Sequence, residues 1–406
     1  MNGNRPLIAV IAVALCVRLA VILIFTDFTT TNYWEYGEIA KNVLAGNGYS
    51  FFSMKGDSLE YRYSQGIKTF PSAFMSPGYV AFLLPFLALN NSLLANILII
   101  FFQVCISTVT ILLLFHFTEK LFTLTVALLS ALTAALLPDI AFAVSSFTPT
   151  VMFHLVALVL LILLYEESRL SNKKWILVLS ILCSIGVYLR SEFILFVLML
   201  SVLFIIERRW RDGMLILFVT IALLMPWTIR NSSAFGEFVP LGNGLGLNLY
   251  RGNNPYGIGN WGDATIKQYV PRLPQTEKFE LALDSLYRAH AIDFIIHNPE
   301  CIAQYSIEKL FHLWIYTPLQ PRHYYGFYQA ISITILLFFL VGIVSSWSWK
   351  RHKYFYIFFI YSTIIAIIFF TLPRHQTMMR IGMLPFIGIC MAVVWNKIKS
   401  RFLKTS

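Results

Sequence analysis

The chain has 406 residues, of which 58% are hydrophobic and only 13% are charged, and its mean hydropathy is +0.70. This balance excludes an ordinary soluble domain. The net charge is +11, but the basic residues are scattered along the chain instead of forming one face, so we expect no nucleic-acid partner.

Apolar runs that are long enough to cross a bilayer recur along the whole chain. They predict an all-α polytopic membrane protein with about ten transmembrane helices, at residues 7–25, 93–116, 121–138, 149–165, 174–189, 193–206, 214–229, 327–347, 353–371 and 377–396. A further apolar stretch, 78–89, is too short to span and contains Pro85, so we interpret it as an interfacial or re-entrant helix.

The distribution of basic residues predicts the orientation. If both termini are cytoplasmic, most Lys and Arg residues near span ends fall in cytoplasmic loops, as the positive-inside rule requires. These residues are Lys120, Arg169, Lys173, Lys174, Arg208, Arg209, Arg211, Lys350, Arg351, Lys353, Lys397, Lys399, Arg401 and Lys404. Two large loops, about 26–92 and 230–326, then face the extracytoplasmic side.

The first outside loop carries carboxylates at the edge of the bilayer. Apolar residues recur at helical spacing from Tyr33 to Ala45, which predicts an amphipathic interfacial helix that ends at Gly46. Glu35 in this helix is a candidate for catalysis, with Asp27 and Glu38 as alternates. Asn32-x-x-Glu35 is also a capping-box pattern, so Glu35 has an alternative role at the helix start.

Basic residues at the outer rim are candidates for binding a phosphate, because ionisable groups at a membrane rim are costly and often functional. The alternative is that short turns need polar residues and that arginine reaches to the interface from helix ends. The candidates are Arg62, Lys68, Arg190, Arg230, Arg374, His375 and Arg380.

The second outside loop contains a stretch rich in glycine and asparagine, 242–255, which predicts turns with exposed backbone amides. It lacks the lysine and the spacing of a phosphate-binding P-loop. Two amphipathic helices are predicted after it, at 277–297 and 299–314. The five cysteines are scattered and match no metal site or disulfide framework.

Several motifs in order resemble a known family. They are Trp34-Glu-Tyr-Gly-Glu through Ser50, Ser76-Pro-Gly-Tyr79, Leu189-Arg190, Pro226-Trp-Thr-Ile-Arg-Asn231 with Gly252-Asn-Asn-Pro255, and Arg380-x-x-x-x-Pro385. Together they resemble the bacterial relatives of the dolichyl-phosphate-mannose–protein mannosyltransferases.

The resemblance implies a GT-C fold and an inverting transfer of a sugar from a polyprenyl phosphate on the extracytoplasmic side. It implies that Glu35 is the catalytic carboxylate and that neither a metal nor another cofactor is needed. Many relatives carry an aspartate where this chain has Asn32. The candidates for substrate binding are Tyr36, Tyr79, Asn231, Asn253 and Asn254.

The expected partners are a polyprenyl-phosphate sugar, membrane lipids and an acceptor that is a glycan, a lipid or a protein. We expect a bacterial inner-membrane protein with three parts: a module at 1–229, an outside region at 230–326, and C-terminal helices with a basic tail at 327–406. A flippase or other transporter, a polymerase acting on lipid-linked glycans, and a non-catalytic glycan-binding protein remain alternatives.

Overall fold

The fold was analysed on a computed structural model that describes residues 5–56, 58–62, 69–166, 172–259, 264–317 and 326–402. Each of the ten predicted spans contains an α-helix. These helices are α1 (Arg5–Phe25), α4 (Ser92–Leu121), α5 (Leu124–Leu136), α7 (Thr150–Tyr165), α8 (Asn172–Leu189), α9 (Ile194–Ile206), α10 (Trp210–Phe235), α15 (Gly326–Ser345), α16 (Trp349–Ile368) and α17 (Pro373–Phe402). The all-α polytopic fold is therefore confirmed.

Only some of these helices are long and apolar enough to cross a membrane completely. Among the described residues, five helices are long and apolar enough to cross a membrane: α1, α4, α10, α15 and α17. A sixth candidate is α5 with α6 (Pro138–Phe142) and a 3₁₀ turn (Ala143–Ser145), which bend by 55° at the break before Pro138. Proline cannot continue the hydrogen bonding of α5, which accounts for the break. The count of ten stays a prediction.

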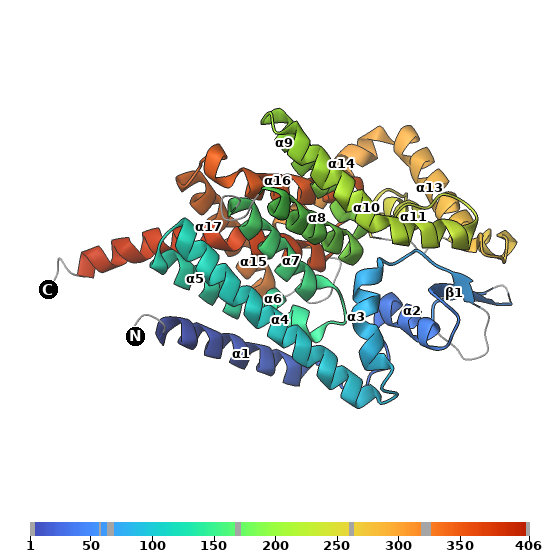
Figure 1. The fold of residues 1–406 in the computed structure, drawn as a ribbon, viewed down its shortest axis with the longest axis horizontal. Helices are drawn as coiled ribbons and strands as arrows, with labels where there is room; N and C mark the ends of the chain where they lie inside the picture. The colour runs from blue at the N-terminus through green and yellow to red at the C-terminus, as the bar shows by residue number, and fades with distance from the viewer. Residues whose placement is uncertain are drawn as a thin grey trace.

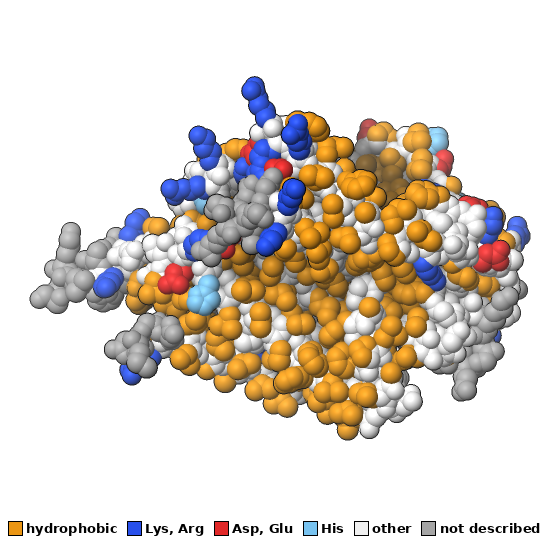
Figure 2. All heavy atoms as spheres, in the orientation of Figure 1, with side chains coloured by type: hydrophobic (Ala, Val, Ile, Leu, Met, Phe, Trp, Pro, Cys, Tyr) orange, Lys and Arg blue, Asp and Glu red, His pale blue; other side chains and the backbone are white. Residues whose placement is uncertain are grey.

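The two ends of the molecule differ in composition. Both termini lie at one end, and α2 (Trp34–Leu44), α11 (Leu245–Gly252) and α13 (Phe279–His297) lie at the opposite end (Figure 1). Figure 2 shows Lys and Arg side chains gathered toward the end with the termini, and a broad hydrophobic surface beside them. The prediction that both termini are cytoplasmic stays a prediction.

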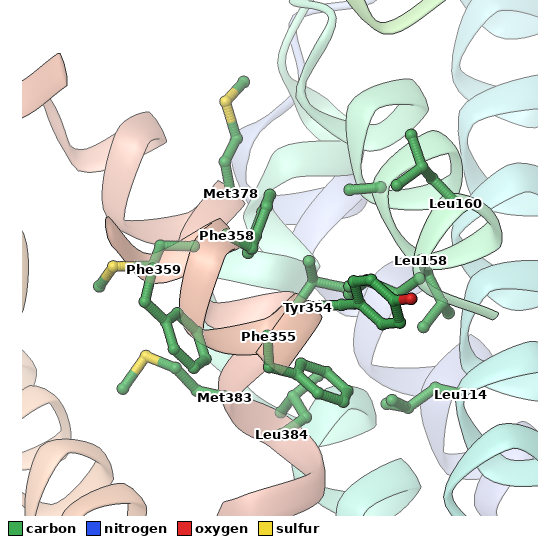
Figure 3. Packing of buried hydrophobic residues seen from close by; sticks show 14 of the residues in the cluster. Leu114, Leu158, Leu160, Tyr354, Phe355, Phe358, Phe359, Met378, Met383 and Leu384 are labelled. Atoms are coloured by element: carbon green, nitrogen blue, oxygen red, sulfur yellow. The ribbon is translucent and has the colours of Figure 1, made fainter. Parts of the chain in front are cut away.

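The largest core cluster lies among the spans and unites the first and last parts of the chain. Figure 3 shows aromatic side chains of α16, including Phe355 and Phe359, packed among Met383 and Leu384 of α17 and leucines of α4 and α7. Helix α17 packs closely on both α5 and α15. The last helix is thereby fixed against α5, which lies more than 200 residues earlier in the sequence.

The outer part is built from short elements. They are α2, the strands β1 (Ser50–Lys55), β2 (Ser58–Glu60) and β3 (Thr69–Pro71), α3 (Pro77–Leu87), α11, α12 (Ala264–Lys267), a 3₁₀ turn (Val270–Arg272), α13 and α14 (Pro299–Trp314). The strands form an antiparallel sheet in the order β2-β1-β3, which the sequence analysis did not predict. The predicted helices of the second outside loop are confirmed as α13 and α14.

Two expectations for the second loop were wrong in detail. Helix α10 continues through Pro226 to Phe235, so that Arg230 and Asn231 are helical and do not lie in a loop. Helix α11 occupies residues 245–252, where only turns were expected. The carboxylate of Asp284 accepts the free N–H groups of Gly246 and Leu247 at the start of α11, which stabilises a helix in a glycine-rich stretch.

Candidate functional site

Glu35 lies half-buried in the first turn of α2. The capping box is not formed, because the N–H of Asn32 donates to Oγ1 of Thr30, at 3.1 Å. The side chain of Asn32 instead accepts from the N–H of Trp34 at 3.2 Å. Trp34 has φ of +57°, a left-handed conformation that is uncommon outside glycine. The Glu35 carboxylate therefore has no capping role, and a strained residue precedes it.

Helix α2 packs its aromatic face on α3 (Pro77–Leu87), which is in turn bonded to the membrane helix α4. The buried ring of Tyr36 meets the ring of Tyr79 edge to face, with centroids 5.4 Å apart. The hydroxyl of Tyr79 donates to Oε1 of Gln103 on α4 at 3.1 Å. These contacts fix the rotation of α2 and, with it, the direction of Glu35.

Opposite α2 lies a cluster of basic residues that are far apart in the sequence. Arg190, between α8 and the next turn, forms an ion pair with Glu192. Its Nη2 lies 3.1 Å from Nε2 of His375, and since a guanidinium only donates, this nitrogen accepts. Arg374 comes directly before His375 at the start of α17 and has a buried Nε.

A small pocket, with a cavity volume of about 30 Å³, lies at this cluster. Its polar lining includes Arg190, Glu192, Ser362 and His375, and further residues of α7, α14, α16 and α17 complete it. The pocket lies where the helices meet the outer elements.

Glu35 and Tyr36 are electrostatically coupled to this cluster. Burial raises the pKa of the Tyr36 phenol, and the positive charges of Arg374 and Arg190 oppose that rise. The charges of Glu35 and Glu192 act on the same phenol in the opposite direction. One carboxylate from α2 and residues from two distant turns therefore converge on a single site.

Arg251 is a further member of the cluster that the sequence analysis did not select. It lies at the end of α11, and its guanidinium stacks over the ring of Phe370 at 4.4 Å. Its pKa is lowered to about 10, chiefly by burial and also by the charge of Arg374, while Glu35 opposes the shift. In the sequence, Arg251 could have been selected because it directly precedes the Gly252-Asn-Asn-Pro motif.

The alternate carboxylates have other partners. Asp27 is exposed and accepts from the N–H and the hydroxyl of Thr29, which lowers its pKa. Glu38 is buried and pairs with Lys41 at 2.7 Å. Within the described residues, the carboxylate of Glu35 has no hydrogen bond or ion pair of this kind.

Several predicted site residues instead connect parts of the structure. Arg230 donates to the carbonyls of Ser72 and Tyr49, both at 2.6 Å, and so ties α10 to the first outside loop. Asn231 accepts from Arg230 at 3.1 Å. These bonds use the groups that a substrate would otherwise contact.

The two asparagines after α11 are also buried and bonded to protein groups. Asn253 donates to the carbonyl of Ile368 and accepts from Lys309 at 2.8 Å. Asn254 donates to the carbonyls of Tyr250 and Gly257. They hold the segment that follows α11 in place.

The remaining predicted basic residues lie apart from the cluster. Arg380 pairs with Asp139 and donates to Ser332 at 2.9 Å inside the helix bundle. Arg62 is exposed beside β2. Lys68 lies outside the described residues.

No group of three or more His, Cys, Asp or Glu residues suited to a metal ion occurs in the part of the chain that the structure describes. The expectation that no metal is needed stays a prediction.

Part of the chain is similar in sequence to a known protein family. Residues 76–229 match the sequence profile of the family described as Dolichyl-phosphate-mannose-protein mannosyltransferase. This region is less than half of the chain, and it contains the Ser76-Pro-Gly-Tyr79 and Leu189-Arg190 motifs but not the first-loop motif. No curated protein matches the chain in sequence at a significant level.

Solved structures match the fold over nearly the whole chain. The archaeal oligosaccharyltransferase AglB from Archaeoglobus fulgidus, in complex with an inhibitory peptide and a dolichol-phosphate, has a TM-score of 0.55 and 11% identity. That match covers 98% of this chain and 51% of AglB. A second AglB structure, with Zn and sulfate, has a TM-score of 0.57, 11% identity and coverage of 97% and 50%. The chain thus spans about half the length of AglB.

A weaker likeness is to ArnT from Cupriavidus metallidurans bound to undecaprenyl phosphate, with a TM-score of 0.45, 12% identity and coverage of 96% of this chain and 78% of ArnT. This score is too low to bear on the fold. The match to AglB and the family profile confirm the predicted resemblance. The chain is a multi-pass membrane protein with a GT-C-type fold, and its residues 76–229 are similar to the protein mannosyltransferases.

Proposed function

We propose that this protein transfers a sugar from a polyprenyl-phosphate carrier to an acceptor hydroxyl on the extracytoplasmic side of a bacterial inner membrane. The observation that carries the proposal is that Glu35 and the basic residues Arg190 and Arg374 come within electrostatic reach of one another around Tyr36. A carboxylate can take the proton of an acceptor hydroxyl, and neighbouring guanidinium groups can stabilise a leaving phosphate.

In the proposed reaction, Glu35 takes the proton of the acceptor hydroxyl as its oxygen attacks the anomeric carbon. The bond between that carbon and the phosphate oxygen breaks, and the electron pair leaves with the phosphate. A single displacement of this kind inverts the anomeric configuration. Arg374 and Arg190 stabilise the negative charge that develops on the leaving phosphate.

The carrier itself supplies the activation. A lipid phosphate is already a leaving group, so the reaction consumes no nucleotide. Support for a polyprenyl phosphate comes from the family likeness of residues 76–229 and from AglB, whose structure contains a dolichol-phosphate. The elements α11 and α13 lie at the end away from the termini (Figure 1), which is the extracytoplasmic side in the proposed orientation.

Transfer by the full chain in nanodiscs tests this function. Radiolabelled polyprenyl-phosphate sugars are supplied with a membrane extract from a strain that lacks the gene, which provides the acceptor. We expect label to move from the lipid to an acceptor without added nucleotide. If no donor is consumed although the protein is folded, the transferase proposal is wrong and the transport or glycan-binding alternatives gain support.

A further inference from the structure

Arg251 has no role in the reaction described above, yet it occupies the same site. Helix α11 ends directly after it, and Gly252 lies against the carbonyl of Phe369, where a Cβ has no room. Nζ of Lys309 binds both Oδ1 of Asn253 and the carbonyl of Ile367, at 2.8 and 3.0 Å. The end of α11 is therefore fastened to the segment that leads into α17.

This attachment places two guanidinium groups in one site. Arg251 comes from α11 and Arg374 from the first turn of α17, and the positive charge of Arg374 helps to lower the pKa of the Arg251 guanidinium. Phe370 supports the Arg251 guanidinium from one side at 4.4 Å. Like charges are held together here by the protein, at a cost in stability that an anionic ligand would remove.

The charge balance of the cluster leaves a place for an anion. Among the described residues, Glu192 is already paired with Arg190, and Glu35 is the other carboxylate that acts on the cluster. The Nε atoms of Arg251 and Arg374 are both buried, and neither has a hydrogen-bond partner among the residues that the structure describes. Three guanidinium groups thus face two carboxylates, with donors left over.

We propose that Arg251 binds the phosphate of the lipid-linked donor together with Arg374, so that guanidinium groups from two separate elements share one phosphate. The proposal rests on the transferase function above. Arginine suits this role because its planar fork donates two parallel hydrogen bonds to a phosphate. Phe370 and the fastening of α11 hold the fork in position before the donor arrives, which reduces the entropy lost on binding.

The test measures affinity for undecaprenyl phosphate, which has no sugar to transfer, by competition binding in neutral phosphatidylcholine nanodiscs. We expect Arg251→Gln to raise the Kd about 10- to 100-fold, since hydrogen bonds to charged groups contribute about 1.5–3 kcal/mol. Arg251→Lys keeps the charge but not the fork, and we expect a smaller rise. Glu35→Gln removes a negative charge and is expected not to weaken binding.

Arg272→Gln is the matched control. Arg272 is exposed in the same outer region and stacks over Tyr269 at 5.8 Å, but it lies outside the cluster. Its Kd is expected to equal that of the wild type. An unchanged Kd in folded Arg251→Gln overturns the proposal. If Arg251→Gln does not fold, Arg251→Lys takes its place. An unchanged Kd in Arg251→Lys means that the planar guanidinium does not bind the phosphate, and it overturns the proposal.

The failure of this inference is distinguishable from failure of the proposed function. If the wild type transfers sugar and binds undecaprenyl phosphate but Arg251→Gln binds it equally well, only the role of Arg251 is wrong. If the wild type binds no lipid phosphate at all, the proposed donor class is wrong and the inference falls with it.

Discussion

At the scale of single residues, Glu35 and Glu192 are two carboxylates in one cluster with different surroundings. Glu192 is bound in an ion pair to Arg190 and balances its charge. Glu35 is half-buried beside Tyr36, with Arg374 and Arg251 within electrostatic reach. This difference favours Glu35 as the group that is free to accept a proton and Glu192 as a residue that positions Arg190.

The sequence was sufficient to select Arg190, Arg374 and His375, because each is polar at the outer end of an apolar run. It was not sufficient to separate them from Arg230 and Arg380. Arg380 is bound to Asp139, and the two are 241 residues apart in sequence. Such a partner is brought close by tertiary packing, and local sequence patterns do not predict it. Whether each residue contacts the substrate stays a prediction.

The first prediction at this scale concerns Glu280 on α13. Its buried Oε1 accepts from the N–H of Ala73 at 2.7 Å. Burial raises its pKa to about 7, against opposing hydrogen bonds from Ser72, Ala73 and Asn243, and nearby Asp284 adds to the rise. The folded state thus holds a proton that the unfolded state releases above a pH of about 4.5.

The free energy of unfolding should therefore fall as the pH rises from about 4.5 to about 7, by roughly 1–3 kcal/mol from this residue. Glu280→Gln keeps an acceptor for Ala73 and should flatten that fall in thermal unfolding measured across this range. Glu300→Gln, at an exposed carboxylate on α14, is the control. A pH slope that is the same in Glu280→Gln and the wild type would contradict the assignment.

At the scale of elements, the spans were predictable and the outer parts were not. Long apolar runs force helices, since a bilayer leaves no other way to satisfy backbone hydrogen bonds. The sheet β2-β1-β3 consists of short strands whose pairing brings Ser50 opposite Pro71, and such contacts between distant residues leave no periodic signal. Helix α11 was missed because Asp284 stabilises its start from another element.

A second prediction tests how α17 is attached to α6. Asp139 and Arg380 form an ion pair with only 10% and 6% of their side chains exposed. Removing one partner leaves an uncompensated charge, so Asp139→Asn or Arg380→Gln should each lower the free energy of unfolding by about 3–5 kcal/mol. The double variant should lose less than the sum of the two, as a double-mutant cycle in detergent can measure.

The control for this cycle is the exposed pair of Lys278 and Glu237, at 2.9 Å. Lys278→Gln should leave the unfolding transition where it is in the wild type, because exposed ion pairs contribute little. Strict additivity of Asp139→Asn and Arg380→Gln would show that the buried pair does not couple the two helices.

At the scale of the whole molecule, α2 and α11, which carry the candidate residues Glu35 and Arg251, lie at one end (Figure 1). Both termini and many basic side chains lie at the other end (Figures 1 and 2). This asymmetry was predictable because the positive-inside rule depends only on residue counts near span ends. The number of spans was less predictable, since α7 and α9 are shorter than the bilayer core requires and α16 begins with three basic residues.

A third prediction tests this topology by cysteine labelling. Cys301 is exposed on α14, in the loop that we place outside. A membrane-impermeant maleimide should label it in intact spheroplasts, and Cys301→Ser should abolish that signal. Adding Lys350→Cys to Cys301→Ser should give labelling only after the membrane is permeabilised. Labelling of the Cys301→Ser, Lys350→Cys variant in intact spheroplasts would contradict the proposed topology.

The central claim is that Glu35 is the general base of a lipid-phosphate-dependent sugar transferase. Its most direct test compares the turnover rate of the wild type with that of Glu35→Gln, using the polyprenyl-phosphate sugar that the wild type consumes, with Asp27→Asn and Glu38→Gln alongside. We predict that Glu35→Gln lowers kcat by about 10²–10⁴-fold with donor binding retained, as loss of a general base does, and that the other two variants keep most of the activity. A Glu35→Gln protein that is folded and transfers sugar at the rate of the wild type would contradict the account.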